Sequence, residues 1–542
     1  MNILLINPPQ IPLNDFNMTT ALRMGYPAYP PVGLGYLTSA VKKDGKHCVE
    51  LYDNHLDGML KIVNKESDSI STFKECLKNK LRSVKPDVIG LTIMFSVIYD
   101  NLIECLICIK EMHPEAIIVV GGAHASMAPE SLYKVKEIDY VLSYEAEETL
   151  IGFLDYLDGT GRIEDIQALH YRNNGRFKAN PFLSRETDLD NRAYPDWESL
   201  SLNKYCKTGR FGGAYAIEDY ANKPCAPLLT SRGCRADCAF CTVHKIMGRK
   251  VRMRAPEKVV DEIEYLVKNY GVSFFEILDD DFTYNRKRSL EICREIVRRK
   301  LKIVWTAKNG LIACSLDREL IEAMAESGCR YIQIGVESGN EEILKWIRKP
   351  LSIPKLLKVR EIFRDFPEIY LAGYFVLGFP HETKEMMRDT YNLAIKLGLD
   401  WSAITMAQPL PNSRMYEDFV CEGLLKEDEI NYGDLTFFHN TMGNKYCTMR
   451  EILDMWYEFN IGVNFINNPN LNGGNLDRAI RDFYHIGCEL VPGHAMSLYC
   501  LSKAYEKKGD HGNFKKYYAE AASILKEDAE WQKWFKHFNL SV

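Results

Sequence analysis

The chain has 542 residues, of which 46% are hydrophobic and 26% are charged, and its formal net charge is -6. This length is too great for one hydrophobic core and predicts about three or four compact units. The acidic balance offers no basic field for nucleic acid, and the sequence has no run of about 18 apolar residues. We therefore expect neither a nucleic-acid partner nor a membrane span.

Sixteen cysteines are scattered through predicted helices and strands, without the spacing of a secreted disulfide framework. The first residues, MNILLINPP, are apolar but short, and they lack the basic flank of an export signal. These features favour a reducing, cytoplasmic location, where free thiols and iron–sulfur clusters survive.

Residues 1–158 alternate short apolar runs with helical patterns. Five apolar runs with helical crossovers predict a doubly wound, Rossmann-like parallel sheet. The runs are NILLI (2–6), CVELYD (48–53), DVIGLTI (87–93), AIIVVGG (116–122) and DYVLSY (139–144). Sheets of this kind bind ligands at the carboxyl ends of their strands.

Residues 159–222 lose this alternation and predict a linker, with a small hairpin around Asn174-Gly175. Residues 223–415 then carry six strand–helix repeats, which predict a partial barrel of parallel strands. The strand runs lie at 227–231, 274–278, 302–307, 330–336, 369–378 and 402–410. The fold class is therefore α/β, with loops at one face of the barrel building the site.

Residues 416–542 are predicted to be mainly helical. The segment 494–525 has the small and aromatic spacing of one tetratricopeptide-like helical hairpin. Because a single hairpin cannot bury its own face, we expect it to pack on the preceding helices.

Three thiols stand in the stretch CRADCAFC, directly after the first barrel strand, at Cys234, Cys238 and Cys241. Three thiolates on a cluster of four irons leave one iron without a protein ligand, and that vacancy can bind a substrate. The alternative is a tetrahedral zinc site completed by Cys225 or His244.

The CRADCAFC stretch resembles the cluster motif of the radical S-adenosylmethionine (SAM) superfamily. The resemblance implies a 4Fe-4S cluster whose open iron is chelated by SAM. It also implies one-electron cleavage of SAM to a 5'-deoxyadenosyl radical, and hence an electron donor such as ferredoxin or flavodoxin.

Later strand ends resemble the SAM-binding segments of the same superfamily: FFEILDDDFTYN, YIQIGVESGN and GYFVLGFPHET. The residues carried over for SAM are Phe240, Asp279, Asp280, Glu337, Ser338 and Gly378. Carboxylates suit the SAM ammonium group. Helix capping is the alternative role for Ser338 and for the neighbouring Asp281.

The first 158 residues resemble the cobalamin-binding domain that precedes the radical SAM core in one large subfamily. The matching segments are NPP, YPPVGLGYL, VVGGAHAS and SYEAEETL, and the residues carried over for cobalamin are Asn7, Pro8, Pro31, Ser96, Gly121 and Gly122. Glycines there would let the backbone approach a bulky ligand, or would serve only as structural punctuation. The last segment departs from the usual Gly-Glu-Gly-Glu, so no contact is carried over to it.

The stretch DNHLDG, residues 53–58, matches the Asp-x-His-x-x-Gly motif that supplies a cobalt ligand in other cobalamin proteins. There the motif follows the first strand, whereas here it follows the second. We interpret the match as coincidence and expect His55 to be a loop residue near the pocket rim, leaving the lower face of cobalt without a protein ligand.

The combined resemblance implies a cobalamin-dependent radical SAM enzyme that methylates an unactivated carbon of a small-molecule, lipid or peptide substrate through methylcobalamin. The alternatives are a cyclase, ring-contraction or oxidation enzyme with the same cofactors, and a non-catalytic cobalamin sensor. Aromatic residues of the carboxyl-terminal region, Tyr432, Phe437, Phe438 and Tyr446, are candidates for substrate contact, with core packing as the alternative.

Overall fold

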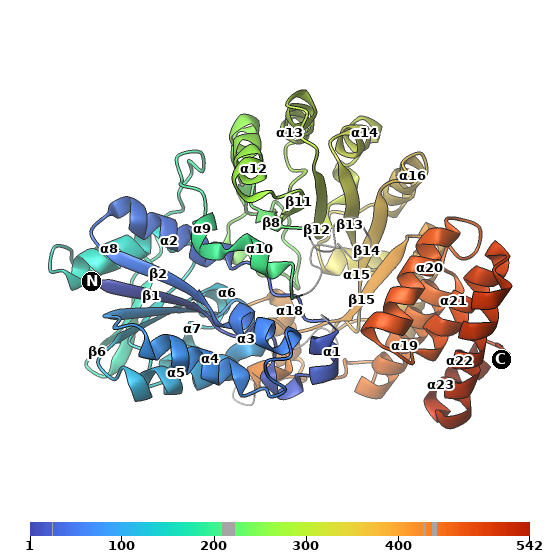
Figure 1. Ribbon diagram of the computed structural model, residues 1–542, viewed down its shortest axis with the longest axis horizontal. Coiled ribbons are helices and arrows are strands. Elements are labelled where there is room, and N and C mark those ends of the chain that lie inside the picture. The colour runs from blue at the N-terminus through green and yellow to red at the C-terminus, as the bar shows by residue number, and fades with distance from the viewer. Residues whose placement is uncertain (24, 209–222, 427–429, 436–441, 542) are drawn as a thin grey trace.

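The computed structural model describes residues 1–23, 25–208, 223–426, 430–435 and 442–541. An amino-terminal sheet and a carboxyl-terminal set of helices lie at opposite ends of the long axis, with a curved parallel sheet between them (Figure 1). This arrangement confirms the predicted α/β class and the helical carboxyl-terminal region.

The amino-terminal sheet has the strand order β2-β1-β3-β4-β5-β6-β7. Its first five strands pair in parallel: β1 (Asn2–Asn7), β2 (Cys48–Asp53), β3 (Val88–Thr92), β4 (Ile117–Gly121) and β5 (Tyr140–Leu142). The chain order reverses between β1 and β3, which makes the carboxyl ends of these two strands the switch point where such sheets bind ligands.

Helices cover both faces of this sheet because alternate residues of each strand point to opposite sides. Leu4 and Ile6 pack into one core with α4 (Thr72–Arg82) and α5 (Tyr99–Met112). Ile3 and Leu5 pack into the other core with α2 (Val32–Asp44) and α8 (Glu147–Leu157). The remaining helices here are α1 (Met18–Leu22), α3 (Asn54–Val63), α6 (Ala123–Met127) and α7 (Pro129–Tyr133).

The hairpin expected around Asn174-Gly175 is present, as β6 (Leu169–Asn173) and β7 (Arg176–Ala179). Both turn residues have positive φ, 50° and 78°, as a tight hairpin turn requires. The β6 strand pairs antiparallel with β5, so the hairpin extends the first sheet instead of standing apart from it. The short helices α9 (Trp197–Leu200) and α10 (Leu202–Tyr205) follow it.

The second sheet has six parallel strands in the order β15-β14-β13-β12-β11-β8. They are β8 (Cys225–Leu228), β11 (Phe274–Ile277), β12 (Val304–Leu311), β13 (Cys329–Glu337), β14 (Tyr370–Leu377) and β15 (Trp401–Met406). Four helices arc around the outer side of this curved sheet (Figure 1): α12 (Pro256–Tyr270), α13 (Arg286–Arg298), α14 (Arg318–Glu326) and α16 (Ile353–Phe363). Two further helices are α15 (Glu341–Trp346), after β13, and α17 (Lys384–Leu397), after β14. The predicted partial barrel is confirmed, and all its strands end at one edge.

The carboxyl-terminal region contains α18 (Arg414–Cys421), α19 (Met449–Ile461), α20 (Leu476–Tyr484), α21 (Ala495–Lys508), α22 (His511–Glu527) and α23 (Ala529–His537). The α21–α22 pair is the expected hairpin, and its apolar residues share a core with residues of α19, α20 and α23. In the part of the chain that the structure describes, no helix is long and apolar enough to cross a membrane.

Candidate active site

The loop that carries the three thiols is framed by a small antiparallel pair, β9 (Ser231–Arg232) and β10 (Arg252–Met253). Gly233 begins the loop with a φ of 99°, and a Cβ there would lie 2.8 Å from the carbonyl oxygen of Gly248. The Cys234 amide donates to that same carbonyl at 3.2 Å. The glycine is therefore needed to close the loop on itself.

All three predicted cluster cysteines are free and at least half-buried. Burial raises the pKa of Cys238 to about 11 and that of Cys241 to about 12, and the proximity of the other thiols adds to both. Burial likewise raises the pKa of Cys234. Buried thiols on one short loop need a cationic centre to be stable as thiolates, which is the chemistry that an iron–sulfur cluster supplies.

Neither of the two residues considered as a fourth zinc ligand is grouped with the thiols in the described part of the chain. Cys225 starts β8, at the end of the strand opposite the cysteine loop. His244, in the short helix α11 (Val243–Ile246), pairs with Asp237 at 3.3 Å. Within the described ranges, no three His, Cys, Asp or Glu side chains are grouped to hold a single metal ion. This includes the three loop thiols themselves, so the fit to a four-iron cluster with one open iron rests on the number and spacing of the thiols in the CxxxCxxC stretch.

Three consecutive aspartates follow β11, and only one of them keeps capacity for a ligand. Asp279 accepts hydrogen bonds from the Thr230 amide at 2.6 Å and from the Ser231 hydroxyl at 2.6 Å. Asp281 forms a two-pronged ion pair with Arg235 at 2.7 and 2.9 Å. Within the described residues, the Asp280 carboxylate accepts a hydrogen bond only from the amide of Gly233, at 3.2 Å.

Burial raises the pKa of Asp280 to about 6, and the charges of its two aspartate neighbours raise it further. An ammonium group beside Asp280 would relieve that strain. Of the two aspartates carried over for SAM, Asp280 is thus the better suited to the amino group, while Asp279 joins the ends of β8 and β11.

Glu337 ends β13 in the left-handed region, with a φ of 65°, and is 6% exposed. Its carboxylate pairs with the Lys349 ammonium at 2.8 Å. Burial acts to lower the pKa of Lys349, but Glu337 and the thiols of Cys238 and Cys241 outweigh it and raise that pKa. An ammonium group therefore lies beside both the end of β13 and the cysteine loop.

The Ser338 side chain is fully buried in protein contacts. It lies 3.1 Å from the Thr390 hydroxyl and accepts from the Asn340 amide at 3.1 Å. The cap of α15 is instead Asn340, whose side chain accepts from the Ile343 amide at 3.2 Å. Ser338 orders the loop before the helix.

Gly378 follows β14 with a φ of 84°. Glu382 bends back to accept from the amides of Gly378, at 2.7 Å, and Phe379, at 3.2 Å. Burial raises the pKa of Glu382 to about 8, and its other oxygen has no hydrogen-bond partner in the structure. Phe240 packs near the Phe379 ring, with 6.1 Å between centroids, so the cysteine loop and this loop meet.

Residues carried over for cobalamin gather at the carboxyl edge of the first sheet. Asn7 is buried, donates to Asp53 at 2.9 Å and accepts from Gln10 at 2.9 Å, and the Pro8 carbonyl accepts from Gln10 at 2.8 Å. Pro31 stands at the amino end of α2. Asn7 and Pro8 therefore shape the loop after β1 through contacts within the protein.

The loop after β3 offers both polar and apolar groups. The Ser96 hydroxyl lies 2.8 Å from Nδ1 of His124, whose Nε2 lies 2.9 Å from the Ser131 hydroxyl. Met94 and Phe95, just before it, are 45% and 54% exposed. Two large apolar side chains open at the switch point fit a broad, flat ligand such as the corrin ring.

The paired glycines after β4 differ from each other. Gly122 has a φ of 115°, and a Cβ there would lie 2.5 Å from the carbonyl oxygen of Ile93. A Cβ on Gly121 would lie 3.3 Å from the Leu142 carbonyl oxygen. Position 122 therefore requires glycine because the backbone of Ile93 leaves no room for a Cβ atom.

The expectation for His55 needs correction. His55 is not a loop residue at the rim, since it lies in the first turn of α3, is 2% exposed and stacks on Phe73 at 6.1 Å. Asp53 caps the helix by accepting from the Leu56 amide at 3.0 Å, and a Cβ on Gly58 would lie 2.3 Å from the Phe73 ring. The motif residues thus have local structural roles.

Residues of the carboxyl-terminal region contact the loop after β3 in the first domain and the loop after β14 in the barrel. The Tyr432 ring lies 4.9 Å from His124 and 5.4 Å from Tyr99, beside the loop after β3. The Asn444 amide donates to the carbonyls of Phe379 and Glu382 at 2.7 and 2.8 Å. Tyr446 is 53% exposed, and Phe437 and Phe438 lie outside the described residues.

The concave face of the barrel also holds polar residues that the strand-end motifs did not indicate. Glu276 and Thr306 are register partners on β11 and β12, and both are buried with one oxygen lacking a hydrogen-bond partner in the structure. Lys308 follows two residues later on the same face. For Glu276 and Thr306, the only signal in the sequence is a polar residue within an otherwise apolar strand run. No sequence pattern indicated that Lys349 would lie at the site.

These features define the class. Residues 228–394 match the family model of the radical SAM superfamily, and residues 25–154 match that of the B12 binding domain. The chain is a cobalamin-dependent radical SAM enzyme, and the predicted cofactors, a 4Fe-4S cluster, SAM and cobalamin, are confirmed at the level of these domains.

The chain is also similar in sequence to several proteins with assigned names. The chain is 28% identical to an uncharacterized methyltransferase of Pyrococcus horikoshii over 83% of this chain and 90% of that one. It is 26% identical to cytidylyl-2-hydroxyethylphosphonate methyltransferase of Streptomyces wedmorensis over 74% of this chain and 80% of that one. It is 28% identical to the anaerobic magnesium-protoporphyrin IX monomethyl ester cyclase of Rubrivivax gelatinosus over 72% and 66%.

Among solved structures, the fold is similar to the radical S-adenosylmethionine methyltransferase TsrM from Kitasatospora setae, with cobalamin and a [4Fe-4S] cluster bound. The TM-score is 0.60 at 18% identity, covering 78% of this chain and 75% of TsrM. At that identity the likeness supports the fold.

Proposed function

We propose that this enzyme transfers a methyl group to an unactivated carbon of its substrate. The observation that carries the proposal is the pairing of a three-thiol loop with a cobalamin-type domain in one chain, together with two methyltransferases among its relatives. When bound, the cluster and SAM supply a carbon radical, and cobalamin supplies a methyl carrier.

The chain's own residues hold and orient these groups. Asp280 has the open carboxylate for the SAM ammonium, and Lys349 has the positive charge beside Glu337 at the end of β13. Met94 and Phe95 present an apolar surface to the corrin. Fixed groups of this kind raise the rate by positioning reactants before the chemical step.

Water exclusion is the second contribution of the chain. Tyr432 packs on the loop after β3, and Asn444 fastens the same carboxyl-terminal region to the loop after β14. One region therefore spans the edges of both domains, where a radical must be shielded from solvent.

The test is turnover of the reconstituted enzyme with methyl-labelled SAM, a reductant and the small-molecule fraction of a cell extract. We expect S-adenosylhomocysteine and 5'-deoxyadenosine to form together, and labelled methyl to appear in an extract compound. A Cys234→Ala protein is the control and should form neither. Turnover that gives 5'-deoxyadenosine without any labelled product would contradict the proposal.

A second candidate is a cyclase or related oxidation with the same cofactors, which the similarity to the Rubrivivax cyclase favours. It predicts 5'-deoxyadenosine without S-adenosylhomocysteine, so the same experiment separates the two.

We also propose that the electron reaches the cluster from a ferredoxin or flavodoxin in a reducing cytoplasm. All sixteen cysteines are free, as that compartment would keep them. Reduction of the cluster by a purified flavodoxin system, followed as SAM cleavage, tests this directly.

A further inference from the structure

The segment SYEAEETL, which departs from the pattern of the related domains, carries two glutamates that face the barrel. Glu145 follows β5 and Glu147 begins α8, and their side chains are 7% and 15% exposed. Tyr144 before them has a φ of 66°, and its amide donates to the Ser126 hydroxyl at 2.7 Å. A strained, anchored turn thus aims both carboxylates away from their own domain.

Glu145 contacts arginines from both strands that frame the cysteine loop. One oxygen lies 2.7 Å from Nη1 of Arg232, on β9, and 3.1 Å from Nη1 of Arg252, on β10. The other oxygen pairs with Nη2 of Arg252. Arg232 and Arg252 are register partners, so this one carboxylate holds the two strands from the side of the first domain.

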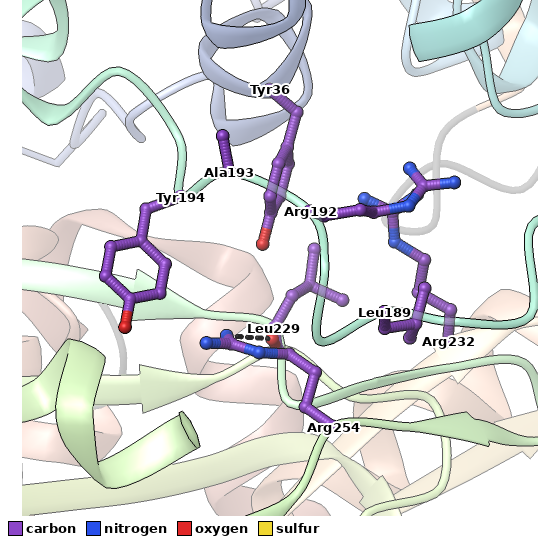
Figure 2. A pocket seen from close by; sticks show the side chains of 8 residues that line it. All are labelled: Tyr36, Leu189, Arg192, Ala193, Tyr194, Leu229, Arg232 and Arg254. Carbon is purple, nitrogen blue, oxygen red and sulfur yellow. Dashed lines mark hydrogen bonds between the residues drawn. The ribbon is translucent and has the colours of Figure 1, made fainter. Parts of the chain in front are cut away.

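Arg232 is held from two further directions. Its Nη2 lies 2.8 Å from Glu147, and its guanidinium lies 4.9 Å from the centre of the Tyr36 ring, on α2. Figure 2 shows Tyr36, Arg192 and Arg232 around a cavity of about 10 Å³, enough for one water molecule. Arg192 from the linker pairs with Glu147, which completes the set.

The set comprises Glu145, Glu147, Arg192, Arg232 and Arg252, and we call it the interdomain ion cluster. All five side chains are 15% exposed or less, so the loss of one partner would leave a buried charge without its counter-charge. Arginine forks on carboxylates also fix direction as well as distance. Arg232 is separated from Cys234 by one residue, so fixing the orientation of Arg232 also constrains the backbone that carries the first predicted cluster ligand.

We infer that Arg232 is a positioning residue, and that the interdomain ion cluster sets the spacing between the cobalamin site of the first domain and the cluster loop of the barrel. The inference rests on the proposed function only in requiring both cofactors in one chain. It does not require methyl transfer.

The experiment measures the magnetic coupling between the reduced iron–sulfur cluster and cob(II)alamin in the reconstituted full chain, which reports their separation. Arg232→Met is expected to retain both cofactors, with the distribution of separations broadened at least twofold. Arg232→Lys keeps the charge but not the fork, and should fall between this variant and the unmodified protein.

Arg254→Met is the matched control. Arg254 lines the same cavity and is similarly buried, but its partner at 2.5 Å, Glu262, belongs to α12 of the barrel itself. This variant removes one buried ion pair without touching the interdomain ion cluster, so its separation should stay unchanged.

The double variant Glu145→Gln and Glu147→Gln covers the case in which Arg232→Met loses its fold, because it leaves the cysteine loop intact. It too should broaden the separation while iron, sulfide and cobalamin contents stay near those of the unmodified protein. An unchanged separation in this double variant would overturn the inference. Loss of cobalamin from it would assign the carboxylates to the cofactor itself, and would overturn the inference as well.

Discussion

Replacing Gly122 by alanine separates a glycine that serves the fold from one that serves a ligand. Gly122 has φ 115° and ψ -176°, a region that is essentially restricted to glycine and costs other residues about 1–3 kcal/mol. The added Cβ would also lie 2.5 Å from the oxygen and 2.8 Å from the carbon of the Ile93 carbonyl. These are backbone atoms and cannot rotate away.

We expect Gly122→Ala to destabilise the junction of β3 and β4 by about 3 kcal/mol even without cobalamin, the upper part of that strain range. The junction is held by hydrogen bonds from the Ile93 amide to the Gly121 carbonyl, at 2.8 Å, and from the His124 amide to the Ile93 carbonyl, at 3.1 Å. Since 1.4 kcal/mol is a factor of ten, these amides should exchange with deuterium about 100-fold faster.

The assay is hydrogen–deuterium exchange of peptides covering 88–96 and 117–127 in cobalamin-free protein. Gly33→Ala is the control, because Gly33 lies exposed in α2 with nothing within 4 Å of an added Cβ, and alanine favours a helix. Its exchange should be unchanged or slower. If Gly122→Ala exchanged like the unmodified protein and lost only cobalamin affinity, the steric reasoning would be refuted.

Three further outcomes follow from the site. Replacing Cys234, Cys238 or Cys241 by alanine should remove most of the bound iron and sulfide, whereas Cys225→Ala, at the far end of β8, should retain them. Lys349→Met should lower the free energy of unfolding by about 3 kcal/mol because Glu337 loses its buried counter-charge. Adding Glu337→Gln to Lys349→Met should restore much of this loss, and an equal loss in the single and the double variant would show that the pair contributes nothing. Lys345→Met, at an exposed position, is the control. Burial raises the pKa of Glu382 to about 8, against 4.5 for an unperturbed glutamate, so between these values the folded protein holds a proton that the unfolded protein releases, and stability falls as pH rises through this window. The unfolding temperature of Glu382→Gln should therefore rise relative to that of the unmodified protein from pH 5 to pH 8, and a constant difference would contradict the assignment.

Much of the fold could be predicted because periodicity in the sequence reports burial directly. The apolar run at 48–53 is β2, Cys48–Asp53, and the run at 274–278 contains β11, Phe274–Ile277. The sequence predicted a loop at His55, whereas the structure has helix α3 there. Asp53 at that position is an ordinary helix cap.

In the candidate site too, some residues could be identified from the sequence and others only from tertiary contacts. The cysteine loop is contiguous, so the sequence alone was enough to identify its three thiols. The three aspartates after β11 were equivalent in sequence, and only tertiary contacts distinguished them: Asp279 is bound by Thr230 and Ser231, and Asp281 by Arg235, which leaves Asp280 open.

The sequence by itself determined the order of the two domains, the strands of both sheets and the cluster loop, because each depends on residues close together in the chain. The tertiary structure alone decided that Lys349 pairs with Glu337, that the hairpin at 169–179 extends the first sheet, and that Glu145 and Glu147 meet Arg232 and Arg252. Such ion pairs join charged residues that stand up to 107 positions apart. A local sequence pattern predicts that such charged residues are exposed to solvent. Only the packing of one domain against the other buries them together.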